Sequence, residues 1–336
     1  MRILITTERY FPEIGGLQTV THSLAMEFLA KGHDVVVVTR SKDLEGSVSY
    51  HYKIVRQPSA RELLVLVTWC DIFYQACLGF KSLWPLIFVR RPWFVTHHML
   101  LDSGTSWQRT LGILKKRLAR HAYGISVSRF MAEHVGDGSI VIPNPYDDAV
   151  FFLLEDAKPR NSVVFVGRLI HAKGCHVLLQ ALAILDEQGI CVECTIIGDG
   201  PERERLQDLA YELNLSRLRF VGYLVGDLLA DELRNHSVMA IPSIWPEPFG
   251  VVALEGIAAG CVAVASDVGG LPEALGDCGL LVPPNNPRAL ADGLTVAMNM
   301  NVDADDRGRH LSSHQKRCVG ESYLRQFERK IMGLRA

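Results

Sequence analysis

Nearly continuous apolar runs alternate with amphipathic stretches near the start of the chain. The runs at 3–6 and 35–38 have apolar residues at almost every position, which is typical of strands buried on both faces of a parallel sheet. Between them, four apolar residues fall on one helical face before Gly32, which ends the helix: Leu17, Val20, Leu24 and Phe28. This order predicts a βαβ unit.

The same order recurs beyond Asn144. A strand is expected at 163–166 and another at 192–197, and the helix between them has its apolar face at Val177, Ala181, Leu182 and Leu185. The sequence therefore predicts two parallel sheets in an α/β protein. Ligands of such folds lie outside the carboxyl ends of the strands, so we expect a substrate cleft between the two domains.

Composition agrees with this division. A chain of 336 residues, 48% hydrophobic and 21% charged, is long enough for two globular domains. Two prolines in the segment 142–147 place the boundary there, which gives domains 1–146 and 147–316. The formal net charge of −2 argues against nucleic acid as the principal partner.

The segment 241–255 contains two carboxylates in different settings. Prolines at 246 and 248 oppose a helix before Phe249, whereas 251–259 lacks helix breakers. Glu247 is therefore expected on a loop and Glu255 on a short helix. Backbone N–H groups of Phe249, Gly250 and Val251 would be free at the helix start, where they favour a phosphate or a polar sugar edge.

Two further loops follow predicted strands. In the loop 165–174, Gly167 permits a tight exit from the strand, and Arg168 and Lys173 supply two cations that suit a diphosphate. Gly15 and Gly16 precede the first helix, so that backbone N–H groups there can approach a ligand closely.

Together these segments resemble the retaining, nucleotide-sugar-dependent glycosyltransferases of family 4. The motif E-P-F-G-x-x-x-x-E begins at Glu247, V-G-R-L-x-x-x-K-G spans 166–174, and P-x-x-G-G spans 12–16. The resemblance implies the GT-B architecture, with two Rossmann-like domains whose parallel sheets face each other across an interdomain cleft. It also implies that the helix predicted near the carboxyl end, 317–336, crosses back onto the first domain.

The resemblance also assigns roles. It implies that Arg168 and Lys173 neutralise the donor diphosphate, that Glu255 binds the ribose, and that Glu247 meets the transferred sugar. A histidine at the end of the strand near 95–98 would lie near that sugar; spacing from Thr96 favours His98, but His97 stays open. The expected catalytic residues are Glu247, Arg168, Lys173 and His98.

The remaining contacts that the resemblance implies are made largely by backbone groups. Gly15 and Gly16 would lie near the donor phosphates and, with His97 and His98, on the acceptor side. The expected donor-binding residues are Gly16, Arg168, Lys173, Gly198, Leu224, Glu247, Phe249, Gly250, Val251 and Glu255.

No metal or cofactor is expected. The two cations would make a divalent ion unnecessary, and the one D-x-D triplet, at 303–305, falls in a polar segment. The close cysteine pair, Cys191 and Cys194, lies in an apolar run and is interpreted as buried reduced thiols.

We therefore expect a metal-independent retaining hexosyltransferase that moves a sugar from a UDP-sugar to a glycan or lipid-linked acceptor. An epimerase or glycan phosphorylase of the same fold, or a non-catalytic sugar-nucleotide-binding subunit, are the alternatives. No secretory signal is recognised, so a cytoplasmic protein is expected. The helix 109–120 leaves peripheral contact with an anionic membrane open, because Leu111, Leu114 and Leu118 share a face beside several cations.

Overall fold

A computed structural model of the chain describes residues 1–13, 15–42, 50–100, 106–136, 138–154, 162–300 and 302–335. Contacts divide the chain into two compact units, Met1–Pro145 with Lys316–Ala336, and Tyr146–Gln315. We call them the amino-terminal and the carboxyl-terminal unit and describe each by itself.

The amino-terminal unit is built on a parallel sheet of seven strands in the order β3-β2-β1-β4-β5-β6-β7. Its strands are β1 (Arg2–Thr7), β2 (Asp34–Thr39), β3 (Lys53–Arg56), β4 (Ile72–Gln75), β5 (Trp93–His97), β6 (Tyr123–Ser126) and β7 (Ile140–Val141). The apolar runs predicted as strands at 3–6 and 35–38 are the buried parts of β1 and β2.

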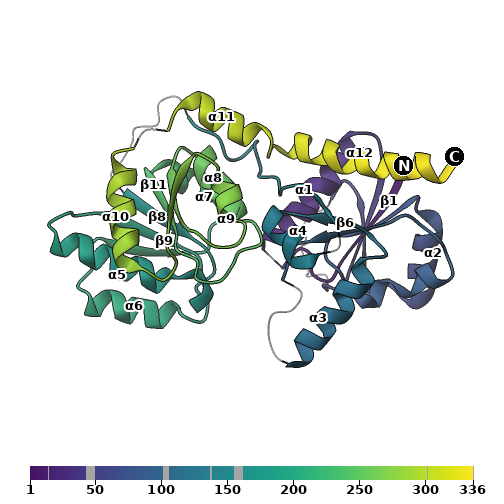
Figure 1. The fold of residues 1–336 in the computed structure, drawn as a ribbon, viewed down its shortest axis with the longest axis horizontal. Coiled ribbons are helices and arrows are strands. Elements are labelled where there is room, and N and C mark those ends of the chain that lie inside the picture. The colour runs from purple at the N-terminus through teal and green to yellow at the C-terminus, as the bar shows by residue number, and fades with distance from the viewer. Residues whose placement is uncertain are drawn as a thin grey trace. The chain divides into compact units, whose positions relative to one another are not determined.

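Five helices belong to the described part of this unit, and the first two along the chain bury apolar side chains. The helices are α1 (Gly16–Ala30), α2 (Ala60–Trp69), α3 (Ser106–Ala119), α4 (Arg129–Val135) and α12 (Lys316–Arg335), with short 3₁₀ turns η1 (Phe80–Ser82) and η2 (Trp84–Ile87). Although α12 ends the chain, it lies against α1 near its beginning (Figure 1).

An aromatic cluster fixes α12 in place. The rings of Tyr323 and Phe327 are buried on α12 and pack against Phe28 of α1 and Tyr74 of β4. Phe327 also meets Phe94 of β5 at a centroid distance of 4.6 Å. Edge-to-face packing of this kind adds about 1 kcal/mol per pair to the burial of the rings. The carboxyl end of the chain is therefore part of the amino-terminal core.

The carboxyl-terminal unit contains a second parallel sheet, of six strands in the order β10-β9-β8-β11-β12-β13. The strands are β8 (Ser162–Val166), β9 (Glu193–Ile197), β10 (Leu218–Gly222), β11 (Val238–Ile241), β12 (Val262–Ser266) and β13 (Gly279–Val282). The two parallel sheets expected from the sequence are thus confirmed.

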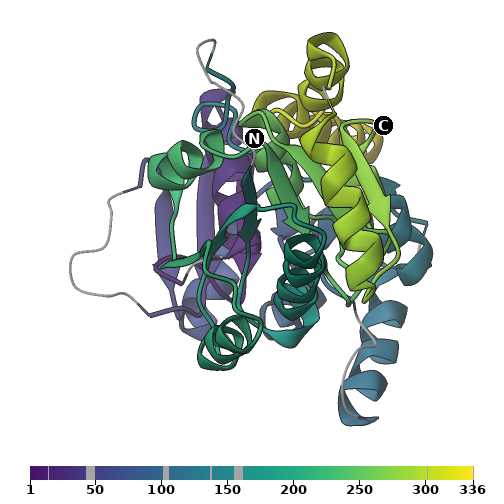
Figure 2. The same ribbon diagram turned by 90° about the vertical axis from the view of Figure 1, so that its left-hand side faces the viewer.

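The helices of this unit are α5 (Cys175–Glu187), α6 (Arg203–Glu212), α7 (Gly226–Arg234), α8 (Val251–Ala258), α9 (Leu271–Leu275), α10 (Pro287–Met298) and α11 (Ala304–Ser312), with the 3₁₀ turn η3 (His171–Lys173). Helix α10 lies beside α5 over the strands (Figure 2). In each sheet the chain reverses its direction of winding beside the first strand, β1 or β8, which is where ligands of doubly wound sheets bind.

Two local expectations can be judged against the structure. The aspartates of the D-x-D triplet start α11, because the Asp303 side chain accepts hydrogen bonds from the backbone N–H groups of Asp305 and Asp306. The interpretation of both close cysteines as buried was wrong: Cys194 is buried in β9, whereas Cys191 precedes the strand and is exposed.

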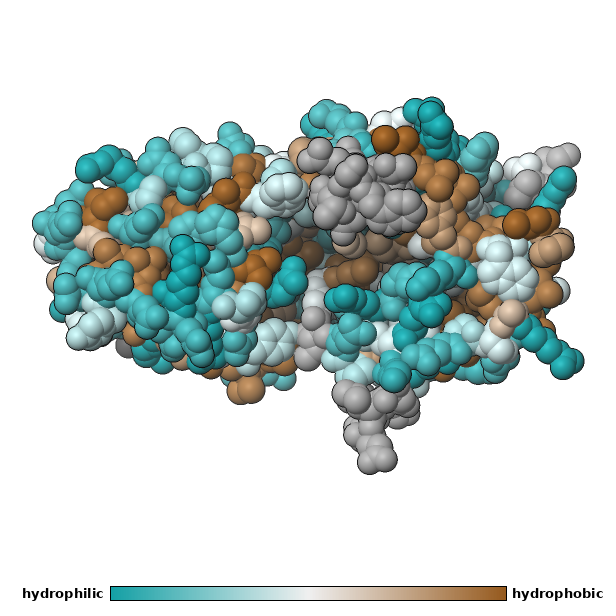
Figure 3. Space-filling view, turned by 90° about the horizontal axis from the view of Figure 1, so that it is seen from below, coloured by the Kyte–Doolittle hydropathy of each residue, from teal (hydrophilic) through white to brown (hydrophobic). Residues whose placement is uncertain are grey.

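Within the described residues, no helix is both long enough and apolar enough to span a bilayer. On the face drawn in Figure 3, apolar residues are interspersed with hydrophilic ones rather than gathered into a continuous band.

Candidate functional site

Three loops of the carboxyl-terminal unit meet at the carboxyl ends of β8, β9 and β11. The N–H of Leu169 donates to the carbonyl of Asp199 at 2.9 Å, and the N–H of Glu202 donates to the carbonyl of Leu169 at 3.0 Å. The N–H of Ile244 donates to the carbonyl of Ala172 at 2.9 Å. These backbone bonds hold the Arg168–Lys173 loop between its two neighbours.

Glycine is needed at two points of this contact. Gly198 has φ 136° and Gly174 has φ 68°, and both values favour glycine. A Cβ on Gly198 would lie 1.9 Å from the carbonyl oxygen of Gly167, and one on Gly174 would lie 1.8 Å from that of Pro242. Any side chain at these positions would push the loops apart. The structural role of Gly198 is therefore to let the loop after β9 contact the loop after β8 closely.

Lys173 and Glu247 form an ion pair in the centre of this group of loops. The distance from Lys173 Nζ to Glu247 Oε1 is 2.5 Å, and the two side chains are 27% and 16% exposed. The buried Ser243 hydroxyl donates to the same carboxylate oxygen at 2.6 Å. A partly buried pair of this kind is held in one orientation more firmly than an exposed one.

The loop that carries Glu247 is fixed from behind by the next loop. The N–H of Gly270 donates to the carbonyl of Glu247 at 2.7 Å, and a Cβ on Gly269 would lie 2.2 Å from that carbonyl oxygen. The glycines of the segment 266–273 therefore support the Glu247 loop through close backbone contact.

Arg168 differs from Lys173 in its surroundings. Its side chain is exposed, and within the part of the chain that the structure describes it forms no ion pair. Its guanidinium can therefore bind an anion without first breaking an internal pair, whereas Lys173 is already oriented by Glu247.

Helix α8 begins where the sequence predicted and ends one residue earlier, at Ala258. Gly250 precedes it with φ 108°, and no side chain caps the helix, so its first N–H groups are available at the site. The Phe249 ring is buried and stacks on His314 at a centroid distance of 5.7 Å. The ring of Phe249 thus anchors the loop in the core, while the backbone from Phe249 to Val251 forms the start of α8.

Glu255 lies on α8, as predicted, one turn beyond its start. Burial, and to a smaller extent the neighbouring Asp147 carboxylate, raise the pKa of its carboxyl group to about 7. Glu255 in turn contributes to a raised pKa of Tyr223, the residue next to Leu224, although burial of the phenol is the larger cause. Tyr223 therefore lies within electrostatic range of Glu255.

The predicted residues of the amino-terminal unit lie at the carboxyl edge of its own sheet. Gly16 begins α1 and Gly15 precedes it in extended backbone, and no side chain caps this helix. His97 ends β5 and is buried. His98 is the first residue after the strand, and its Nε2 is shielded from solvent with no hydrogen-bond partner among the described residues.

Burial, and to a smaller extent the neighbouring His97, lower the pKa of His98 to about 3. His98 is thus a neutral imidazole with a buried nitrogen that a bound ligand could satisfy. Nδ1 of His97 is shielded from solvent as well, so the choice of His98 over His97 as the site histidine stays a prediction.

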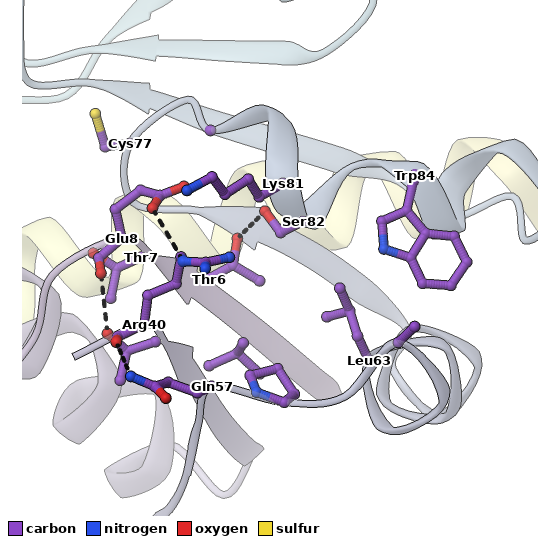
Figure 4. Close-up of a pocket in the computed structure, with 15 residues that line it drawn as sticks. Thr6, Thr7, Glu8, Arg40, Gln57, Leu63, Cys77, Lys81, Ser82 and Trp84 are labelled. Carbon is purple, nitrogen blue, oxygen red and sulfur yellow. Dashed lines mark hydrogen bonds and ion pairs between the residues drawn. The ribbon is translucent and has the colours of Figure 1, made fainter. Parts of the chain in front are cut away.

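A cavity of about 320 Å³ at the ends of β1, β2 and β3 was not predicted from the sequence. Figure 4 shows Glu8, Arg40 and Lys81 toward one end of it, and Leu63 and Trp84 toward the other. The remaining lining residues are Thr6, Thr7, Val38, Thr39, Gln57, Pro58, Ala60, Cys77, Gly79 and Ser82. None of the four residues expected on the acceptor side lines this cavity.

One group of metal-ligating side chains comes together in the described part of the chain. His171, His176 and Glu202 place one potential ligand atom each within 4.8 Å of the others, beside the loop that carries Lys173.

The comparisons with known proteins agree with this geometry. Residues 149–312 match the family model described as glycosyl transferases group 1. A phosphatidyl-myo-inositol mannosyltransferase of Mycolicibacterium smegmatis is 34% identical over 232 residues, which cover 65% of this chain and 58% of the relative. Across three curated relatives, the matched part spans 40%, 58% and 62% of their own length, which is less than two thirds.

Solved structures match over nearly the whole chain. Sucrose-phosphate synthase from Thermosynechococcus elongatus has a TM-score of 0.78 at 22% identity and covers 99% of both chains. Anabaena HepE in complex with UDP and glucose has a TM-score of 0.72 at 20% identity, again covering 99% of both chains. At this level of identity the likeness concerns the fold, and it confirms the fold class expected from the sequence.

Proposed function

Since residues 149–312 carry the glycosyl transferases group 1 domain and the chain has the GT-B fold, we propose that it is a retaining, metal-independent hexosyltransferase. Its donor is a nucleoside diphosphate sugar, with UDP as the nucleotide. The observation that carries the proposal is the arrangement at one sheet edge of Lys173 paired with Glu247, exposed Arg168, and Glu255 on α8.

The donor binds along the loops of the carboxyl-terminal unit. Arg168 and Lys173 neutralise the diphosphate, and the uncapped start of α8 adds backbone N–H donors for phosphate or sugar oxygens. Glu255 accepts hydrogen bonds from the ribose hydroxyls, and Leu224 lies beside the base. UDP as the nucleotide is supported by HepE, whose structure was solved with UDP and glucose.

Glu247 orients the sugar that is transferred. Its Oε1 already accepts from Lys173 and Ser243, which fixes the carboxylate plane and leaves Oε2 for sugar hydroxyls. Because Lys173 touches Glu247 and is assigned to the diphosphate, one cation links the two reacting parts of the donor.

The transfer itself is a displacement at the anomeric carbon. The bond from that carbon to the diphosphate oxygen breaks, the acceptor hydroxyl oxygen bonds to the same face of the sugar, and the acceptor proton passes to the departing phosphate. The products are a glycoside of retained configuration and the nucleoside diphosphate. Fixed positive charge from Arg168 and Lys173 stabilises the charge that develops on the leaving group, so no divalent ion is required there.

We assign the acceptor to the cavity in the amino-terminal unit. A sugar offers hydroxyl groups along its edges and an apolar face, and the cavity offers Glu8, Arg40 and Lys81 toward one end and Trp84 toward the other. His98, Gly15 and Gly16 would flank the reacting hydroxyl, since they lie at the carboxyl edge of the same sheet.

A lipid-linked acceptor would bring α3 to a membrane. Ile113 and Leu114 on this helix are each 54% exposed, and Arg117 is exposed beside them, whereas Leu118 packs on the core and the side chain of Leu111 lies outside the described residues. Co-sedimentation with anionic lipid vesicles at low salt tests this role, and an unchanged result for Ile113→Glu with Leu114→Glu would exclude it.

The proposed reaction is tested by incubating the full chain with labelled UDP-sugars and glycan acceptors without divalent cations. Label in a glycoside with retained anomeric configuration supports it. Epimerised nucleotide sugar formed without acceptor would favour the epimerase alternative, and a requirement for inorganic phosphate would favour the phosphorylase. Nucleotide binding with no turnover would favour the non-catalytic subunit.

A further inference from the structure

Two histidines and a glutamate that the proposed reaction leaves unused meet beside the donor loops. His171 begins η3, His176 is the second residue of α5, and Glu202 directly precedes α6. One potential ligand atom from each lies within 4.8 Å of the others. The three residues come from the segment after β8, which continues into α5, and from the segment after β9, which leads into α6.

The backbone around this group is held firmly. The carbonyl of Leu169 accepts from the N–H of Glu202 at 3.0 Å, and a Cβ on Gly200 would lie 2.5 Å from that carbonyl oxygen. The start of α6 is therefore pressed against the loop that carries His171. Ligands on such fixed backbone need to move only their side chains to reach a common ion.

The two histidine rings lie face to face. They stack in parallel, with centroids 4.5 Å apart and planes 8° from each other. His176 Nδ1 is shielded from solvent and, among the described residues, has no hydrogen-bond partner.

Small side-chain movements would complete the site. Tetrahedral zinc holds nitrogen and oxygen ligands at about 2.0–2.2 Å, which puts them roughly 3.4 Å apart, so ligand atoms within 4.8 Å of one another must close by up to roughly 1.4 Å as the side chains turn. Glu202 Oε1 accepts from Arg205 Nη1 at 2.9 Å, and Arg205 is 69% exposed and free to turn toward water. The carboxylate is thus available to an ion.

We propose that His171, His176 and Glu202 bind one divalent transition-metal ion, zinc being the best match to two imidazoles and a carboxylate. The site is separate from the diphosphate chemistry, where no metal is required. Its consequence for the protein is to clamp the Arg168–Lys173 loop to the start of α6, so occupancy stabilises the carboxyl-terminal unit. The binding claim holds whether or not the proposed transferase reaction is correct.

The test uses the full chain, stripped of metal, titrated with Zn²⁺ and with Co²⁺. We expect one equivalent of each per chain, a Co²⁺ spectrum of nitrogen and oxygen ligation without thiolate charge-transfer bands, and a melting temperature several degrees higher with Zn²⁺. His171→Gln, His176→Gln and Glu202→Gln should each weaken Zn²⁺ binding at least tenfold. Glu204→Gln, on the exposed side of α6, and His51→Gln, in the other unit, are matched controls with unchanged affinity.

Unchanged Zn²⁺ affinity in both His171→Gln and Glu202→Gln would overturn the proposal. These two side chains are exposed and half-buried, respectively, so the variants should fold, and circular dichroism of the metal-free proteins checks this. A thiolate band in the Co²⁺ spectrum would also overturn it by assigning the ion to a cysteine, such as the exposed Cys191 or the exposed Cys318.

Discussion

Lys173 Nζ lies 2.5 Å from Glu247 Oε1, so two residues that the sequence places 74 positions apart act on each other directly. The motifs around them predict a cation for the diphosphate and a carboxylate for the sugar. Their contact means that neither can be altered without changing the other. Lys173 orients Glu247, and Glu247 keeps Lys173 from turning to solvent.

We predict that Lys173→Ala lowers kcat/KM for the donor about a hundredfold or more, because it removes charge from the leaving group and frees Glu247. Steady-state kinetics with varied donor measures the loss. The Lys173→Ala, Glu247→Gln double variant should lose much less than the product of the two single losses. Strictly multiplicative losses would show that the ion pair has no role in turnover.

Glu247→Gln is expected to lower kcat with little change in the affinity for free UDP. The substitution preserves size but weakens the acceptor that orients the sugar, and UDP has no sugar to orient. Calorimetric titration with UDP and turnover on the UDP-sugar separate the two effects. A loss of UDP affinity equal to the loss of kcat would place Glu247 on the nucleotide instead.

Glu255 predicts a pH-dependent affinity for the donor. Its pKa is raised to about 7, and the ionised carboxylate is the stronger acceptor for ribose hydroxyls. UDP affinity should therefore rise with pH through 7 and be about tenfold lower one unit below the pKa, where the group must release its proton to bind. In Glu255→Gln this dependence should vanish; its persistence would assign the titration to another group.

The same carboxyl group affects stability with a defined sign. Because the folded pKa lies above the unfolded one, the folded chain binds more protons between about pH 4.5 and 7, and stability falls as pH rises through this window. Urea unfolding of the ligand-free chain should show this slope. Glu255→Gln should be more stable than the parent chain at pH 8, and equal stability there would contradict the burial of the charge.

If the acceptor binds in the cavity of the amino-terminal unit, a substitution there should change the KM for the acceptor. Trp84→Ala should raise the acceptor KM roughly tenfold without changing the donor KM, because it removes an apolar face for the sugar ring. Val65→Ala on the exposed side of α2 is the control. An equal rise in the donor KM would mean that the cavity serves folding or the donor.

Much of the fold could be read from the sequence because buried parallel strands are continuous apolar runs. The runs at 3–6 and 163–166 became β1 and β8, Gly16 begins the helix after β1, and Arg168 lies on the loop after β8. The sequence placed Glu255 on a helix because the stretch that contains it lacks helix breakers between Gly250 and Gly260. These predictions succeed where local residue preference and the tertiary structure agree.

Two features could not be predicted from the sequence, because both depend on contacts between segments that are distant along the chain. The cavity is lined from the ends of separate strands, and no motif joins Glu8, Arg40 and Trp84. The group of His171, His176 and Glu202 forms because the loop after β9 is hydrogen-bonded to the loop after β8. The end of β5 at His97, which periodicity alone locates only to within a few residues, also had to come from the structure.

The most direct test of the central claim is calorimetric titration of UDP into the full chain, compared with Arg168→Ala and with Arg129→Ala, an exposed arginine on α4 of the other unit. We predict one site per chain with micromolar affinity, weakened at least tenfold by Arg168→Ala and unchanged by Arg129→Ala. No binding of UDP or of any other nucleoside diphosphate, or equal binding by the Arg168→Ala variant, would contradict the assignment of this sheet edge to the donor.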